Sequence, residues 1–133
     1  MILLDASVLL AAEDADDLHH ADAVALLRTG ALATVDLALY EVTNIAELRW
    51  RDPAASLRLR QRIWAIGEFG AIVRIDEALA ERVAELMREH PISAYDAGYV
   101  AAAERLAVPL ASCDERDLIA PGLASPPGAL LQS

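Results

Sequence analysis

Residues 1–7, Met-Ile-Leu-Leu-Asp-Ala-Ser, place four apolar residues directly before a carboxylate and a hydroxyl. A short apolar run bounded in this way is typical of a fully buried β-strand. The following residues, Ala-Ser-Val-Leu-Leu-Ala-Ala-Glu, favour a helix over 6–13. A buried strand that leads directly into a helix is the first half of a parallel β-α-β unit. Asp5 would then stand at the carboxyl end of the first strand.

The alternation of short apolar runs and longer helical patterns continues along the chain. It predicts an α/β fold, a three-layer α/β/α sandwich with a central parallel sheet of four to five strands. Asp36 and Asp76 are positioned to cap the helices that follow them. We expect strands at 1–4, 31–35, 71–75 and 108–113, and helices at 6–13, 19–29, 37–51, 54–68, 77–89 and 94–107.

Length and composition limit the kinds of protein that this chain can be. We expect one domain over 1–133, with a loop-like tail over 121–133, because 133 residues that are 56% hydrophobic supply one sizeable core. No apolar run approaches the roughly 20 residues that cross a bilayer, and the start lacks the basic leader of a signal peptide. The single Cys113 excludes an internal disulfide and a cysteine pair for zinc. A cytoplasmic protein without a membrane partner is therefore expected.

The charge of the chain excludes several enzyme classes. It has 21 acidic and 11 basic residues, a formal net charge of −10, and no lysine. The absence of lysine excludes a P-loop lysine, a Schiff-base lysine and a receiver domain that needs a lysine beside its aspartate. The negative charge also opposes non-specific binding to nucleic acid, for which a basic surface is the usual sign.

Four carboxylates stand at positions where an α/β sheet builds its sites. Asp5 ends the first strand, and Asp114 follows the last one, so both belong to the strand ends where ligands bind. Glu41 lies at helical spacing from Leu37 and Ile45, which directs it inward. Asp96 begins a helix and heads the buried stripe formed by Val100, Ala103 and Ala107.

Each of these residues also has a purely structural interpretation. Asp5 can be a helix N-cap, and Glu41 can form a salt bridge to a buried arginine. Ser93 and Asp96 match a capping box, and Asp114 with Asp117 can form a solvated acidic turn. Taken together, however, the four carboxylates share one edge of the sheet, where their mutual repulsion is relieved by a hard cation with oxygen ligands. The set therefore favours a site for Mg²⁺ or Mn²⁺.

The same residues, in the same order, resemble the PIN-domain nucleases, and the short form of the chain resembles the VapC toxins. The resemblance covers almost the whole chain. It implies that Asp5, Glu41, Asp96 and Asp114 form the acidic metal site, with Asp117 as an additional acid. It also implies that Ser7 and Ser112 support these carboxylates. The matching segments are Leu3-Leu-Asp5-Ala-Ser7, Tyr40-Glu41-Val42, Ser93-Ala-Tyr-Asp96-Ala97 and Leu110-Ala-Ser112-Cys-Asp114-Glu-Arg-Asp117-Leu118.

The resemblance implies an endoribonuclease that is the toxin of a VapBC-type toxin–antitoxin pair. It would hydrolyse RNA, leave a 5′-phosphate and a 3′-hydroxyl, and bind a VapB-type antitoxin as a homodimer. The negative charge makes RNA binding the difficult step. Arginine suits bidentate phosphate contact, so a cluster near the cleft is a candidate for RNA binding, although a solvated helix with extended arginines explains it equally well. The cluster consists of Arg49, Arg51, Arg58 and Arg62.

Two other functions compete with this one. The first is a Mg²⁺-dependent phosphatase acting on small phosphate esters. Asp5-Ala-Ser7 lacks the second aspartate that haloacid-dehalogenase-like phosphatases carry two residues after the first. The second is a non-catalytic binding or regulatory module. The presence of all four acids argues against it.

Overall fold

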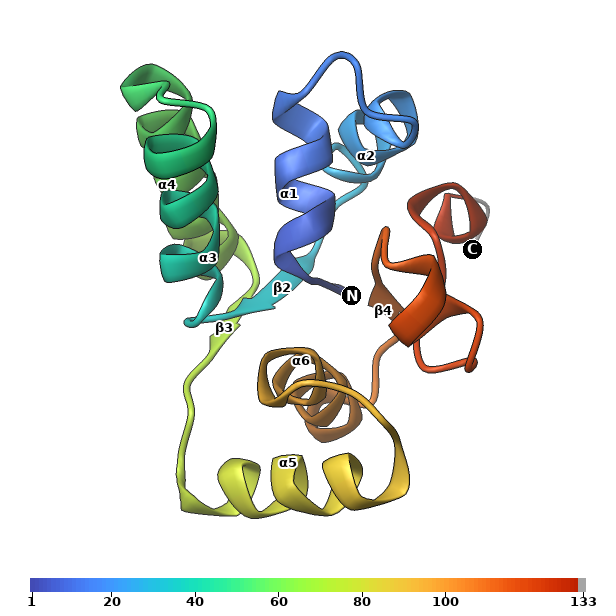
Figure 1. Ribbon diagram of the computed structural model, residues 1–133. Helices are drawn as coiled ribbons and strands as arrows, with labels where there is room; N and C mark the ends of the chain where they lie inside the picture. The colour runs from blue at the N-terminus through green and yellow to red at the C-terminus, as the bar shows by residue number, and fades with distance from the viewer. Residues whose placement is uncertain (132–133) are drawn as a thin grey trace.

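The computed structural model describes residues 1–131 and has a four-stranded parallel sheet at its centre (Figure 1). The strand order is β3-β2-β1-β4. In register, Leu3 of β1 lies beside Ala33 of β2 on one side and Leu110 of β4 on the other. The first strand is therefore central, and its carboxyl end is level with that of the last strand. The strands are β1 (Ile2–Leu4), β2 (Leu32–Val35), β3 (Ala71–Val73) and β4 (Leu110–Ala111).

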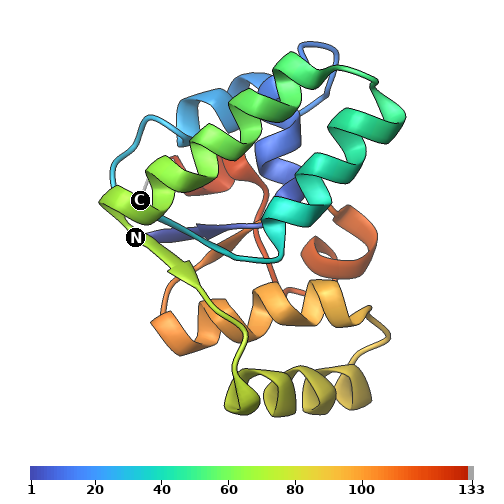
Figure 2. The ribbon, with the colours of Figure 1, turned by 90° about the vertical axis from the view of Figure 1, so that its left-hand side faces the viewer.

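Helices cover both faces of this sheet, which confirms the predicted three-layer sandwich. One layer contains α1, α2, α3 and α4, while α6 lies on the opposite face with α5 outside it (Figures 1 and 2). The helices are α1 (Ala6–Glu13), α2 (His20–Leu26), α3 (Ala38–Asn44), α4 (Pro53–Phe69), α5 (Glu77–Glu89) and α6 (Ala94–Leu106). Three shorter helical segments are η1 (Ile45–Arg49), η2 (Glu115–Ile119) and η3 (Pro127–Leu130).

The core lies between the sheet and α6 on one side and between the sheet and α1 and α4 on the other. Leu3 and Leu4 of β1 are fully buried, because β1 has a neighbouring strand on each side and helices above and below. On α6, Ala97 and Ala102 are buried without any exposed surface. Small side chains at these positions let α6 approach the sheet closely, and this brings its first turn to the ends of the strands.

The region after β2 departs from the single long helix that the sequence predicts. Helix α3 begins at Ala38 without a side-chain cap, so the expected cap at Asp36 is wrong. One carboxylate oxygen of Asp36 is buried and has no hydrogen-bond partner among the described residues. The helix then continues as the π-helical segment η1 and ends before Arg51, which has a φ of 51°. Pro53 disfavours helical backbone in the residue before it, which explains why α4 starts anew.

The other predicted cap and the tail follow the sequence more closely. Asp76 caps α5 by accepting a hydrogen bond from the Leu79 amide at 2.8 Å. In the tail, Ser125 forms an isolated parallel bridge with Ala111, and η3 follows. Residues 132–133 of the predicted tail lie outside the described residues. None of the helices in residues 1–131 has the length and apolar character needed to span a membrane.

Candidate metal centre

One cleft of about 910 Å³ collects four of the predicted acids at the carboxyl ends of the strands. Asp5 follows β1, Asp114 follows β4, Glu41 lies on α3, and Asp96 lies in the first turn of α6. The strand ends, α3, the start of α6 and η2 share one side of the molecule (Figure 2). The grouping of the four acids is therefore a consequence of the parallel sheet.

Asp5 is the most deeply buried of these acids, with only 4% of its surface exposed. It caps α1, because its Oδ1 accepts a hydrogen bond from the Val8 amide at 3.3 Å. The Ser7 hydroxyl donates to the same oxygen. Burial raises the pKa of Asp5 to about 6, against the lowering effect of hydrogen bonds from Ser112, Ser7 and Val8, and the charge of Asp96 raises it further. Asp5 is therefore both a cap and a member of the acidic cluster.

Asp96 is the acid that interacts through its charge with each of the other four acids, Asp5, Glu41, Asp114 and Asp117. One oxygen of its carboxylate lies within 4.8 Å of one oxygen each of Asp114 and Asp117, which are themselves equally close. Burial and the charges of Asp114 and Asp117 raise the pKa of Asp96. Its amide donates to the Ser93 hydroxyl at 3.1 Å, so the predicted helix start is present as well. The cap uses the backbone of Asp96, and its carboxylate remains available to the cleft.

Asp114 and Asp117 come from the chain that leaves β4. Asp114 caps the π-helical segment η2, since its Oδ1 accepts from the Asp117 amide at 3.0 Å. Its own amide donates to the Ser112 hydroxyl at 3.0 Å. Asp117 is held by Arg116, with 3.1 Å between the Arg116 Nε and its Oδ1. The predicted acidic turn is therefore an ordered π-helical turn that fixes both carboxylates beside Asp96.

Glu41 contacts a residue that the sequence analysis did not single out. The Tyr99 hydroxyl donates to Glu41 Oε1 at 2.8 Å, and Tyr99 is 1% exposed. Burial raises the pKa of Tyr99 far above its usual range, and the charge of Glu41 adds to this, so the hydroxyl remains a donor. Burial, and then the charge of Asp96, raise the pKa of Glu41 as well. The alternative of a salt bridge to a buried arginine is wrong for the described structure, because the partner is a tyrosine.

The two predicted supporting serines tie the strand ends together. Ser7 Oγ accepts from the Cys113 amide at 2.9 Å and lies 3.5 Å from Ser112 Oγ. Ser112 is fully buried. These contacts join the chain after β1 to the chain after β4, so they fix Asp5 relative to Asp114.

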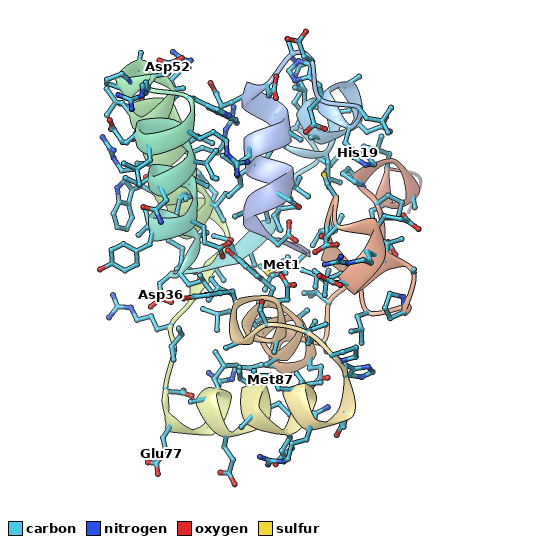
Figure 3. All side chains as sticks on the ribbon, viewed as in Figure 1. Met1, His19, Asp36, Asp52, Glu77 and Met87 are labelled. Carbon is cyan, nitrogen blue, oxygen red and sulfur yellow. The ribbon has the colours of Figure 1, made fainter. Side chains whose placement is uncertain are left out.

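The donor set in the cleft fits a hard divalent cation. Carboxylate and hydroxyl oxygens are the ligands that Mg²⁺ and Mn²⁺ prefer. Three carboxylates with oxygens within 4.8 Å of one another, joined through charge to Asp5 and Glu41, repel one another in the absence of a cation. Among residues 1–131 this is the one group of three acids with oxygens so close together, and other acids such as Asp52 and Glu77 lie at opposite ends of Figure 3. The group could therefore hold a metal ion.

The predicted arginine cluster does not line this cleft. Arg49, Arg51, Arg58 and Arg62 are all exposed, and the Arg58 Nε donates to a Glu13 carboxylate oxygen at 2.9 Å. Among the described residues, none of the 11 arginines lines the cleft. The side chains there that sequence reasoning missed are instead uncharged: Tyr40, Asn44, Tyr95 and Tyr99.

Comparison with known proteins gives one family and several similar folds. The model of the PIN domain family matches residues 2–120. A toxin–antitoxin complex from Klebsiella pneumoniae is similar at 19% identity and a TM-score of 0.74, covering 96% of this chain and 98% of that one. The sarcin-ricin loop cleaving toxin VapC20 of Mycobacterium tuberculosis is similar at 20% identity and a TM-score of 0.76, covering 92% and 95%. FitAcB of Neisseria gonorrhoeae is similar at 21% identity and a TM-score of 0.67, covering 93% and 95%. No curated protein sequence matches the chain.

Proposed function

This chain belongs to the PIN domain family, and on that basis we propose that it is a Mg²⁺- or Mn²⁺-dependent endoribonuclease, the toxin of a VapBC-type toxin–antitoxin pair. One observation supports the proposal most strongly. One oxygen from each of the Asp96, Asp114 and Asp117 carboxylates lies within 4.8 Å of the others. Asp96 and Asp114 line the cleft that also contains Asp5 and Glu41. The charges of Asp114 and Asp117 raise the pKa of Asp96, and a bound cation would relieve this repulsion.

In this proposal Asp5, Glu41, Asp96 and Asp114 hold the metal, and Asp117 adds a fifth carboxylate. When bound, Mg²⁺ or Mn²⁺ orients the phosphodiester, activates water and neutralises charge on the leaving oxygen. The protein holds its ligands in place through neighbouring groups. The Tyr99 hydroxyl fixes one oxygen of Glu41 at 2.8 Å. Ser7 fixes Asp5 and, through the Cys113 amide at 2.9 Å, the chain that carries Asp114.

The substrate in this proposal is RNA, cleaved to a 5′-phosphate and a 3′-hydroxyl, in the cytoplasm. The carboxylates of Asp5, Glu41, Asp96 and Asp114 would hold a dication whose charge would offset theirs where the phosphate must approach. That offset is local, so a chain of net charge −10 would gain little affinity from the rest of its surface. The sarcin-ricin loop cleaving toxin of similar fold supports RNA as the substrate class.

The partner in this proposal is a VapB-type antitoxin, and the toxin acts as a homodimer. The similar fold from Klebsiella pneumoniae comes from a toxin–antitoxin complex. The cleft itself fits such a partner, because its wall carries four carboxylates and no arginine among the described residues. A basic side chain from an inhibitor could form ion pairs there with carboxylates that have no arginine partner in the cleft.

Controlled expression in a bacterial host tests this function. We expect the wild-type chain to arrest growth and Asp96→Asn to abolish the arrest, since the substitution removes the charge at the centre of the cluster. The matched control is Glu81→Gln, an exposed carboxylate on α5 outside the cleft. Growth arrest by Asp96→Asn equal to that of the wild type would show that toxicity does not use the acidic cluster.

A further inference from the structure

Two exposed tyrosines stand at the mouth of the cleft, each directly before one of its acids. Tyr40 precedes Glu41 on α3 and is 82% exposed, while Tyr95 precedes Asp96 on α6 and is 63% exposed. Both line the cleft. Helix α3 and the start of α6 belong to the layers on opposite sides of the sheet (Figure 2), so the tyrosines come from two different walls. Their exposure shows that neither ring is part of the core.

The cleft wall around these tyrosines is apolar and has no positive charge. Leu37, Ile75, Leu79 and Val83 line it next to the acidic cluster. Among the described residues no arginine reaches it, and the chain has no lysine. Contacts from cationic side chains to phosphate, which supply most of the affinity in ordinary nucleic-acid binding, are therefore missing from this cleft. An occupant that presents a flat apolar face beside a phosphate matches this combination of aromatic wall and metal-binding acids.

We propose that Tyr40 and Tyr95 are base-stacking residues that bind an unpaired nucleobase of the RNA beside the scissile phosphate. This inference rests on the proposed ribonuclease function and deepens it. Stacking of a base on an aromatic side chain is tolerant of sequence and needs no positive charge, which suits an acidic protein. Bases inside a duplex are already stacked and cannot enter such a cleft, so the two tyrosines select loops and single strands. The substrate class is therefore RNA with an unpaired base at the cleavage point.

Binding of RNA to an inactive background separates stacking from catalysis. The probe is a fluorescently labelled hairpin RNA pool with a randomised loop, bound in the presence of Mn²⁺ to Asp96→Asn protein and followed by anisotropy. We combine Asp96→Asn with four single substitutions: Tyr40→Ala, Tyr95→Ala, and the conservative Tyr40→Phe and Tyr95→Phe. The control is Trp64→Ala, which removes a 59% exposed aromatic ring of α4 that does not line the cleft. A second probe is the same hairpin with abasic loop nucleotides.

Each alanine variant should weaken binding of the normal hairpin by roughly 5- to 150-fold, which corresponds to the usual strength of one base–aromatic stack. The phenylalanine variants and Trp64→Ala should stay within about threefold of the parent, because a ring is retained or lies elsewhere. The abasic hairpin should bind weakly and equally to all of the variants. Because the tyrosines are exposed, melting temperatures close to that of the parent are expected and would show that the variants fold.

Normal binding of the hairpin by both alanine variants would overturn the inference, as would an equal loss with the abasic hairpin or no binding by the parent. If the alanine variants bind RNA normally but fail to bind a co-expressed protein partner, the tyrosines belong to a protein interface and the inference is again wrong. The failure of the proposed function has a different signature. In that case the wild-type protein does not cleave RNA, while tyrosine-dependent binding of the loop persists; this result supports base stacking by the tyrosines and overturns the placement of a scissile phosphate beside the base.

Discussion

Replacing Asp5 with asparagine is expected to stabilise the metal-free protein. Asparagine is also a good helix N-cap, so its Oδ1 can still accept from the Val8 amide and the Ser7 hydroxyl. What the substitution removes is a buried negative charge, since Asp5 is 4% exposed and stands near Asp96. The effect on the free energy of unfolding therefore isolates the charge.

The magnitude follows from the pKa of Asp5. Burial raises this pKa from 3.8 to about 6, a difference of about two units. At about 1.4 kcal/mol per unit, the ionised carboxylate costs the folded state about 3 kcal/mol. This figure already includes the hydrogen bonds that favour the ionised form. The asparagine amide brings a buried NH₂ group that needs a partner of its own, which costs about 1 kcal/mol or more, so we expect a net gain of about 1–2 kcal/mol.

The pH dependence of this gain has a definite sign. Because the folded pKa of Asp5 lies above its unfolded value, the cost exists where Asp5 is ionised, above about pH 6, and disappears as the pH falls toward 4. Urea unfolding in EDTA near pH 8 should therefore show the variant to be more stable, and near pH 4 the two proteins should converge. Glu81→Gln, which removes an exposed charge on α5, should show no such difference.

Added Mn²⁺ should reverse the order of the two proteins. A ligand that binds only the folded state stabilises it by about 2.7 kcal/mol at a hundredfold excess over its dissociation constant, and only the wild type retains the full set of carboxylates. An Asp5→Asn variant that is less stable than the wild type in EDTA near pH 8 would refute the reasoning. It would show that the carboxylate of Asp5 stabilises the fold and is not strained by its neighbours.

Three further perturbations test other parts of the structure. Tyr99→Phe removes the hydroxyl that donates to Glu41 at 2.8 Å, so it should lower the free energy of unfolding by about 1–2 kcal/mol and weaken Mn²⁺ binding in a calorimetric titration. Unchanged Mn²⁺ affinity would contradict the role of Tyr99 in positioning Glu41. Gly70→Ala would drive a Cβ into the carbonyl oxygen of Leu32 in β2. Thermal unfolding should show a loss of about 1–3 kcal/mol, and a neutral substitution would mean that β2 and this turn are not packed as described. The ion pair with Arg105 and the cap of α5 lower the pKa of Asp76 to about 2, so its stabilising contribution is complete above about pH 4 and is lost as the pH falls toward 2. In Arg105→Gln this loss should be smaller in acid titrations of stability, and an unchanged acid transition would remove the ion pair from the explanation.

Much of the fold could be predicted because it depends on local patterns. The apolar run before Asp5 and the helix after it are sufficient to predict β1 and α1, and the repeated alternation predicts the parallel sheet. The placement of Asp5 and Asp114 at one edge then follows from the parallel topology, while helical spacing directs Glu41, and a helix start directs Asp96, to the same edge. Asp96 is an example. Its place at a helix start predicts the cap by Ser93, and its place at the head of a buried stripe predicts its position in the cleft.

The partners of the side chains were harder to predict because they depend on packing between distant elements. Tyr99 lies three residues after Asp96, on the same face of α6, and this spacing was an available signal. The hydrogen bond from its hydroxyl to Glu41, 58 residues away, depends on how α3 and α6 approach the sheet. The π-helical turn after Asp114 left no recognisable pattern in the sequence. The exposed positions of Arg58 and its neighbours likewise depend on the direction in which α4 leaves η1.

The measurement that tests the metal-dependent nuclease most directly is RNA cleavage by partner-free protein, first in EDTA and then with Mn²⁺ restored, with Asp96→Asn and Glu81→Gln in parallel. We expect the wild type and Glu81→Gln to cleave RNA only with Mn²⁺, and to leave a 5′-phosphate. We expect Asp96→Asn to lose more than about a hundredfold of this rate, because it removes the acid that connects the cluster. Cleavage that persists in EDTA, or that Asp96→Asn retains, would contradict a catalytic metal centre among these carboxylates.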